Sequence, residues 1–320
     1  MTDATLKDRP SDKRDIAVVY ICDHNFHTLT ECSLASFARM HAHALDFYFF
    51  QVGYELPITP ALEDLVTARG HRVIVAQADF PFPEGARPGT GSKVKLLKAQ
   101  AIEMLANSYE RIQYIDGDIL AFADVQLEDI SRFDDLLAAV YDISDKVMQD
   151  RPTLGANGPE LSSAYFNSGF FSVNAARWLK ERALQRFLDL VAQHAEHCPY
   201  YKDCTLGDQC ILNMLANGDW RRLPLTFNAQ KSLLHTSVWA DAKVRHYTGK
   251  QKFIPVQNRT CDARARKLLA SIRKEAGLAI EIPPYDGGVM YSLNRIRRRR
   301  EILHYQALSD AFSQQINAGH

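Results

Sequence analysis

Short apolar runs bounded by polar turns recur along the first half of this 320-residue chain. They span Ile16–Cys22, Leu45–Val52, His71–Ala78, Arg111–Ile115 and Leu136–Ile143. Because they are apolar at both odd and even positions, they suit strands covered on both faces, as in a mainly parallel sheet. Helical patterns lie between them, at Thr28–Met40, Pro60–Arg69 and Lys93–Ala106. The alternation predicts an α/β domain, a central mainly parallel sheet flanked by helices with right-handed crossovers.

Acidic side chains follow the ends of two predicted strands: Asp23 after the first, and Asp116 and Asp118 after the fourth. In open α/β sheets, ligands bind beyond the carboxyl ends of the strands. We expect Asp116 and Asp118 to point to one side of an extended segment, with Gly117 leaving room for an ion. Carboxylate oxygens suit a hard dication, Mg²⁺ or Mn²⁺. An acidic surface turn is the alternative interpretation.

Later segments carry further polar side chains at predicted element ends. Asn167, Ser168 and Gly169 come immediately before an apolar strand, and Asp208 and Gln209 lie in the first turn of a helix. A short strand and turn hold His246, Gly249 and Lys252. Each group also has an ordinary structural explanation: a turn, an N-cap, or a histidine with satisfied hydrogen bonds.

Together these segments resemble the motifs of the family 8 glycosyltransferases, in the family's order, over roughly residues 15–255. The sequence "CDHNF" is similar to the family's "ADDNY", "YIDGDIL" to "YLDxD", and "FNSGFFSVNAARW" to "FNSGVxLINxxxW". Likewise "DQCILN" matches "DQDxLN", and "HYTGKQK" keeps the spacing of "HYxGxxK". The resemblance implies the GT-A fold, that of the nucleotide-diphospho-sugar transferases.

The resemblance also implies roles for single residues, with Mn²⁺ or Mg²⁺ and a UDP-sugar as ligands. The implied metal ligands are Asp116, Asp118 and His246. The nucleotide and its phosphates would be held by Asp23, Asn25, Lys95, Gly117, Gly249 and Lys252. The donor sugar and acceptor would lie beside Asn167, Asp208 and Gln209, the implied catalytic group. One departure is that "KQKFI" lacks the Pro-Trp that commonly closes the family's last motif.

The implied reaction is a metal-dependent transfer of a hexose from a UDP-sugar, with retention, to a glycan or glycolipid such as lipopolysaccharide core. We see no obvious carboxylate nucleophile, which favours attack on the face that the leaving group vacates. Two alternatives stay open. A hydrolase or pyrophosphorylase can use the same acids to hold a diphosphate, and a non-catalytic nucleotide-sugar-binding protein can share the fold.

Composition limits the partners and the location. Lysine plus arginine equals aspartate plus glutamate, 38 each, which argues against nucleic-acid binding through net charge. No apolar segment approaches the length of a membrane span, so we expect a cytoplasmic protein whose 6 cysteines are reduced. Cys198, Cys204 and Cys210 lack the paired spacing of a zinc site.

We expect a flexible tail at residues 1–14, a catalytic domain at 15–255 and a basic helical extension at 256–320. Within that extension, the basic segment 291–305 combines arginines with apolar residues. It is either a peripheral contact to an anionic membrane at the inner face or a solvated helix whose apolar residues pack on the domain.

Overall fold

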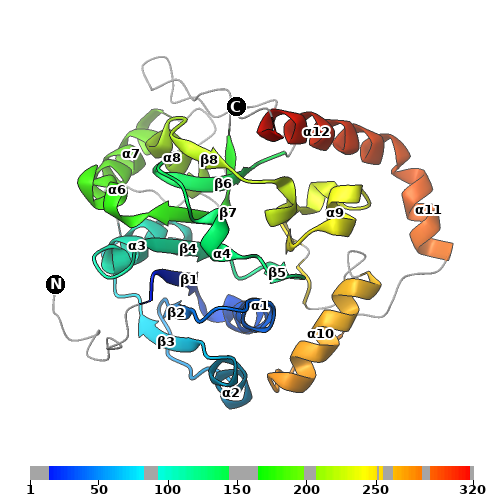
Figure 1. Ribbon diagram of the computed structural model, residues 1–320, viewed down its shortest axis with the longest axis horizontal. Helices are drawn as coiled ribbons and strands as arrows, with labels where there is room; N and C mark the ends of the chain where they lie inside the picture. Colours follow the sequence, from blue (N-terminus) through cyan, green and yellow to red (C-terminus); the bar gives the residue numbers. More distant parts are fainter. Residues whose placement is uncertain are drawn as a thin grey trace.

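A seven-stranded mixed sheet forms the centre of the molecule in a computed structural model (Figure 1). The structure describes residues 14–82, 93–143, 165–197, 207–250, 252–254, 262–282 and 289–317. The strand order is β3-β2-β1-β4-β7-β6-β8. The predicted tail at residues 1–14 falls almost entirely outside the described residues, as do Cys198 and Cys204. The cysteines that are described, Cys22, Cys32 and Cys210, are buried free thiols.

The predicted strands are present with small shifts at their ends. They are β1 (Ile16–Cys22), β2 (Asp46–Gln51), β3 (Arg72–Gln77), β4 (Arg111–Ile115) and β6 (Leu137–Tyr141). β7 (Phe166–Asn174) and β8 (Trp220–Arg222) complete the sheet. β3, β2, β1 and β4 run parallel, as do β6 and β8, whereas β7 runs antiparallel to both of its neighbours. The prediction of a mainly parallel α/β sheet is therefore confirmed.

Helices cover both faces of the sheet (Figure 1). On one side lie α1 (His27–Met40), α2 (Pro60–Ala68) and α10 (Ala263–Glu275). The other side carries α3 (Lys98–Ala106), α6 (Ala175–Lys180), α7 (Ala183–His197) and α8 (Gly207–Ala216). The helix expected at 93–106 begins as a 3₁₀ segment, η2 (Lys93–Leu97), and only then becomes α3. Short pieces are η1 (His24–Phe26), α4 (Leu127–Ile130), η3 (Leu225–Phe227), η4 (Lys231–Leu233) and α9 (Ser237–Asp241).

A second sheet of three short strands extends from the end of β4. It contains β5 (Ile119–Ala121), β10 (Val244–His246) and β9 (Ala229–Gln230), with β10 in the middle. β10 pairs antiparallel with β5, so that His246 lies opposite Ile119. This pairing places His246 next to residues 116–118 (the DGD segment), from which it is separated by more than a hundred positions in the sequence.

Asn167, Ser168 and Gly169 lie inside β7 rather than before it, which corrects the sequence-based placement. The pairing between β6 and β7 is irregular there: Ala139 lies opposite Phe171, but the next residue, Val140, lies opposite Asn167. A bulge of this kind frees the backbone from the ladder and re-aims side chains, and bulges are common beside functional sites.

The last described residues form α11 (Val289–Arg297) and α12 (Arg299–Asn317), which run along the outer edge of the molecule (Figure 1). Helix α12 packs on the main body through Tyr305, which is 6% exposed, and through Phe312, whose ring lies 4.4 Å from that of Tyr141. In the described part of the chain, no helix is both long and apolar enough to cross a membrane.

A buried guanidinium holds β10 in place. Arg245 is 1% exposed; it donates to Asp262 Oδ2 (2.8 Å) and to the carbonyl of Trp239 (2.9 Å), and it lies over the ring of Phe122. Asp262 also caps α10, because its Oδ1 accepts from the backbone N–H of Ala265 (2.9 Å). The Asp262 carboxylate therefore has two roles: it neutralises the buried Arg245, the neighbour of His246 in β10, and it caps the N-terminus of α10.

We predict that Asp262→Ala lowers the free energy of unfolding by about 3–5 kcal/mol, because it leaves the Arg245 charge buried without its carboxylate and removes an N-cap. Asp262→Asn retains a capping side chain, so its loss should be clearly smaller. Urea unfolding of both variants measures the difference. Equal losses would mean that the cap contributes nothing beyond the Arg245 ion pair, which both substitutions remove.

Candidate functional site

A cavity of about 600 Å³ opens beyond the carboxyl ends of β1 and β4. Among its lining residues are Asp23, Lys95, Asp116, Gly117, Asp118, Asn167, Asp208, Gln209, His246, Gly249 and Lys252. The structure thus gathers these sequence-predicted site residues in one place. Asn25 is the exception: it is exposed, does not line the cavity, and donates its backbone N–H to Asp23 Oδ1 (3.1 Å).

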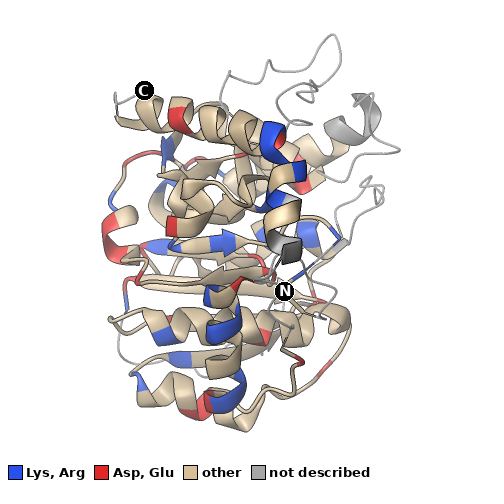
Figure 2. Cartoon of the chain, turned by 90° about the vertical axis from the view of Figure 1, so that its right-hand side faces the viewer, with Lys and Arg blue, Asp and Glu red and all other residues tan. Residues whose placement is uncertain are grey.

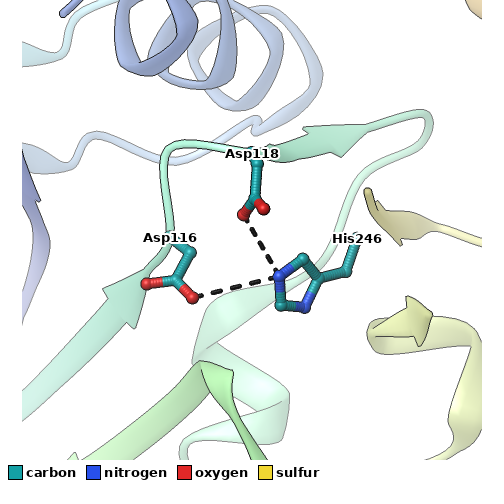
Figure 3. A group of neighbouring side chains, drawn as sticks. All are labelled: Asp116, Asp118 and His246. Carbon is teal, nitrogen blue, oxygen red and sulfur yellow. Dashed lines mark ion pairs between the residues drawn. The ribbon is translucent and has the colours of Figure 1, made fainter. Parts of the chain in front are cut away.

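The DGD segment is a turn and not the extended segment that we expected. The backbone N–H of Ile119 donates to the carbonyl of Asp116 (3.2 Å), which links the end of β4 to β5. The carboxylates of Asp116 and Asp118 nevertheless converge on the same imidazole (Figure 3). His246 Nε2 lies 3.1 Å from Asp118 Oδ1 and 3.9 Å from Asp116 Oδ2.

Asn167 fixes the tautomer of His246. Its Oδ1 accepts from the backbone N–H of Gly169 (3.1 Å) and from Asn228 Nδ2 (3.0 Å), so this atom is an oxygen. His246 Nδ1 lies 3.0 Å from the same oxygen and must therefore donate its hydrogen to it. In the neutral ring, the lone pair is then on Nε2, which faces the two aspartates. This arrangement is typical of a metal-ligating histidine oriented by a second hydrogen bond.

The three side chains fit a divalent cation. One ligand atom from each of Asp116, Asp118 and His246 can be chosen so that all lie within 4.8 Å of one another. Two carboxylates and one imidazole match the ligand preferences of Mn²⁺, and they admit Mg²⁺. Figure 3 shows the carboxylates and the ring directed at a common space.

The glycine that keeps this space open is Gly169. A Cβ there would lie 2.3 Å from His246 Cε1 and 2.9 Å from Asp116 Oδ2. A Cβ on Gly117 would instead lie 2.2 Å from Thr30 Oγ1 on α1. Gly117 thus makes room for a helix, not for an ion, which corrects the reason that we gave for it from the sequence.

Sequence reasoning missed Lys98, a buried cation that links the two acidic groups of the site. Its Nζ lies 2.8 Å from Asp208 Oδ2 and 3.3 Å from Asp116 Oδ1, and it donates to the carbonyl of Ser168 (3.1 Å). Lys98 is 1% exposed, whereas Lys95, the lysine chosen from the sequence, is exposed at the cavity wall. The available signal was a single lysine among apolar residues, in "LLKAQAI".

Gln209 belongs to a buried amide network that also contains Asp142, another residue that we missed. Gln209 Nε2 donates to Asp142 Oδ2 (2.9 Å), while Gln209 Oε1 accepts from Asn167 Nδ2 (3.2 Å) and from the backbone N–H of Ser168 (3.1 Å). Asn167 Nδ2 also donates to Asp142 Oδ2 (3.1 Å). Asp142 directly follows β6, which ends at Tyr141, but the strand predicted from the sequence ran on to Ile143, so the rule used for Asp23 and Asp116 did not single it out.

Opposite charges offset the burial of the site carboxyls. Burial alone would raise the pKa of Asp118, but His246 and the ion-paired Lys252 hold it below its ordinary range. Burial would likewise raise the pKa of Asp208, but Lys98 lowers it below its usual value. Burial disfavours the charge on Lys98, yet Asp116 and Asp208 raise the pKa of this amine. Asp118, Asp208 and Lys98 are therefore ionised at neutral pH.

One side of the cavity carries the groups suited to phosphates. Lys252 is ion-paired with Asp118 and donates to the carbonyl of Tyr247 (3.2 Å). Gly249 has φ +81°, a conformation that favours glycine, and it lies on the cavity wall. Asp23 borders the same cavity from the end of β1.

Comparison with known proteins agrees with this geometry. The family model described as "Glycosyl transferase family 8" matches residues 17–253, more than half of the chain. "Lipopolysaccharide 1,3-galactosyltransferase" of Salmonella typhimurium is 25% identical over 258 residues, which is 76% of this chain and 74% of that protein. "Glycosyltransferase GlyB" of Streptococcus pneumoniae is 34% identical over 119 residues, 37% of this chain and 24% of that protein. "Lipopolysaccharide 1,2-glucosyltransferase" of Escherichia coli is 25% identical over 138 residues, 43% of this chain and 38% of that protein.

The matches to GlyB and to the Escherichia coli enzyme span only about a quarter to two fifths of those relatives. Among solved structures, the galactosyltransferase LgtC, in complex with donor and acceptor sugar analogs, superposes with a TM-score of 0.57 at 19% identity, covering 82% of this chain and 95% of that one. The bifunctional glycosyltransferase WbbM reaches 0.63 at 16% identity, covering 84% and 52%. These likenesses show the GT-A fold.

We predict that Gly169→Ala weakens Mn²⁺ binding at least about 10-fold, because the added methyl group displaces His246 from the two aspartates. Isothermal titration with Mn²⁺ alone measures the affinity. The matched control is Gly207→Ala, whose new Cβ meets nothing within 4 Å and which should bind as the wild type does. Equal affinities in all three proteins would contradict the proposed position of the ion.

We also predict that Lys98→Met destabilises the metal-free protein by about 3–5 kcal/mol at pH 7, because Asp208 is then left charged and buried without its counterion. The lowered pKa of Asp208 contributes stability above the unfolded carboxyl's value of about 3.9, and that stability is lost as the pH falls through the folded pKa. The deficit of the variant should therefore shrink below about pH 4.

Urea unfolding in EDTA at pH 7 and at about pH 3 measures this deficit. Lys95→Met removes an exposed lysine from the same segment and should change the stability by no more than about 0.5 kcal/mol. A deficit for Lys98→Met that is the same at pH 7 and at about pH 3 would rule out the ion pair as its cause.

Proposed function

Because the chain belongs to glycosyltransferase family 8, whose model matches residues 17–253, we propose that it transfers a hexose from a UDP-sugar to a glycan or glycolipid acceptor. The proposed transfer needs a divalent cation and retains the anomeric configuration. The observation that carries the proposal is the convergence of Asp116, Asp118 and His246 in a cavity that Asp208, Gln209 and Lys252 also line.

Asp116, Asp118 and His246 are the residues that would hold Mn²⁺ or Mg²⁺. The ion, when bound, supplies positive charge against the diphosphate of the donor. Asn167 keeps the ligating nitrogen of His246 free by accepting the hydrogen of Nδ1. Gly169 supports the choice of this space, because any larger residue would fill it.

Lys252 and Gly249 are suited to the departing phosphates. Negative charge grows on the β-phosphate oxygen as the sugar leaves, so a cation placed there stabilises the transition state more than the ground state. Lys252 has this charge and is held at the cavity by Asp118. At Gly249 the backbone itself can approach a phosphate closely. We assign Asp23 and Asn25 to the uridine on the resemblance of "CDHNF" to the family motif, and Lys95 to the same end of the donor.

Asp208 and Gln209 lie where we place the donor sugar, and the contacts of both side chains within the protein argue against a nucleophilic role. Asp208 Oδ2 is held by Lys98 and accepts from Ser168 Oγ (3.0 Å). Both ends of the Gln209 amide are engaged within the protein. These contacts support attack on the face that the leaving group vacates, with a phosphate oxygen as base. A covalent sugar on Asp208 or Gln209, detected by intact mass spectrometry, would contradict this mechanism.

The relatives narrow the acceptor class. Their names include a lipopolysaccharide 1,3-galactosyltransferase and a lipopolysaccharide 1,2-glucosyltransferase, which supports a glycan or lipid-linked glycan such as lipopolysaccharide core. The same resemblance supports a catalytic unit at residues 15–255 followed by the extension at 256–320. A cytoplasmic location stays a prediction from the sequence.

We predict that UDP release from a UDP-hexose requires both Mn²⁺ and an acceptor, and that excess EDTA abolishes it. Asp116→Asn or Asp118→Asn, each of which removes one anionic ligand, should lower turnover roughly 10²–10³-fold without unfolding the protein. Asp241→Asn, at an exposed position on α9, is the control with unchanged turnover. A panel of UDP-sugars, assayed for UDP with and without lipopolysaccharide-type acceptors, measures these effects.

The same assay separates the alternative functions. Release of UDP at the same rate without an acceptor would favour the hydrolase or pyrophosphorylase. Binding of the UDP-sugar without turnover on any acceptor would favour the non-catalytic protein. Full activity of Asp118→Asn in the presence of EDTA would contradict the assignment of Asp118 as a metal ligand.

A further inference from the structure

The junction of α11 and α12 combines positive charge with exposed apolar side chains. Arginine occupies five of the six positions from 295 to 300, in a chain whose formal net charge is zero. Arg295, Arg297, Arg299 and Arg300 are all exposed, and Arg298 is partly buried and paired with Glu301 (2.5 Å). Figure 2 looks onto this side of the molecule and shows the basic residues gathered where the two helices meet.

The most exposed large apolar side chains of the described residues lie in the same place. Ile296 is 69% exposed and Leu303 is 58% exposed, while Leu293 is 38% exposed. The other exposed large apolar residues, Phe26, Leu56 and Val75, reach at most 40%. Because a helix brings residues three and four positions apart onto one face, Leu293 neighbours Ile296, and Leu303 neighbours Arg299 and Arg300.

This outward face is distinct from the face that holds α12 on the domain. Tyr305, Ser309 and Phe312 recur at helical spacing, and they are buried or half-buried against the body. Gln306 donates to Ser237 Oγ on α9 (3.0 Å) and fixes the helix further. Helix α12 is therefore held on the main body by residues other than Leu303. Ile296 and Leu303 do not pack on the domain, contrary to one of the two alternatives for this segment.

We propose that the α11–α12 junction docks on the surface of an anionic lipid bilayer, with Ile296 and Leu303 entering the headgroup region and Arg297, Arg299 and Arg300 pairing with lipid phosphates. We call these five residues the docking face. Charge complementarity to anionic headgroups accounts for the arginines, and partition into the interface accounts for the exposed apolar residues between them. A purely polyanionic partner such as nucleic acid would leave Ile296 and Leu303 in water without a role.

Helix α12, which carries three residues of the docking face, packs against η4 and α9 of the main body, so the docking face is held on the domain that contains the cavity. Docking itself does not depend on the proposed transfer reaction.

The test is co-sedimentation of the full chain with large unilamellar vesicles of phosphatidylcholine, with or without phosphatidylglycerol, in the absence of any sugar donor. We expect binding only to the vesicles that contain phosphatidylglycerol, and weaker binding as salt is raised. Arg297→Gln/Arg299→Gln/Arg300→Gln should lower the partition coefficient about 100-fold, because three arginines no longer attract the anionic surface. Ile296→Ser/Leu303→Ser should lower it about 10-fold or more, and this loss should persist at high salt.

The matched control removes the same charge elsewhere. Arg132→Gln/Lys180→Gln/Arg221→Gln changes three exposed basic residues on α6, on β8 and beside α4, and it should bind vesicles as the wild type does. Equal losses in the two triple variants would mean general electrostatic attraction and would overturn the proposal. So would full binding by Ile296→Ser/Leu303→Ser, which would indicate a plain polyanion site.

Absence of binding to phosphatidylglycerol vesicles at low salt would also overturn it. UDP release by the same variants on a water-soluble acceptor separates this question from the proposed function. We expect the docking-face variants to retain that activity, because none of their changed residues lines the cavity.

Discussion

The site depends on the compensation of charge at the end of a buried strand. Asp116, Asp118 and Asp208 line one cavity, two of them buried, and their like charges would repel one another there. Lys98 stands between Asp116 and Asp208, and His246 and Lys252 flank Asp118, so every carboxylate has a partner within the protein. An ion placed between Asp116, Asp118 and His246 would add a further positive charge where two acids already face one ring. Charges within the protein thus offset the acids, and Asp116, Asp118 and His246 already lie close enough together to hold an ion.

Backbone geometry brings these groups together. The antiparallel pairing of β10 with β5 places His246 beside Asp118, and the bulge between β6 and β7 turns Asn167 and Gly169 toward the ring. The buried ion pair of Arg245 with Asp262 fixes β10 from its other side. The three proposed ligands thus come from elements that the core holds. Their relative positions are set by packing, not by a flexible loop.

The two alternatives left by the sequence fare differently in the structure. The intact cluster of Asp116, Asp118 and His246, with its oriented imidazole, gives a non-catalytic binding protein no support. The hydrolase alternative shares every one of these features, and the choice between water and a glycan as acceptor rests on the relatives and on the assay. The C-terminal helices α11 and α12 carry the proposed docking face, whose arginines and exposed apolar residues suit an anionic lipid surface.

Much of this molecule was determined by its sequence. Runs that are apolar at both odd and even positions identified the strands. Asp23, Asp116 and Asp118 were identified as candidate site residues because they directly follow predicted strands, and a strand buried on both faces can meet a ligand only at its ends. The remaining assignments needed distances between residues far apart in the chain. Sequence patterns identify neighbours along one element, but Lys98 became part of the site only when α3 packed beneath the DGD turn. Gly117 and Gly169 likewise look equivalent in sequence, and tertiary packing alone decided that Gly117 faces Thr30 on α1 and that Gly169 faces His246 and Asp116.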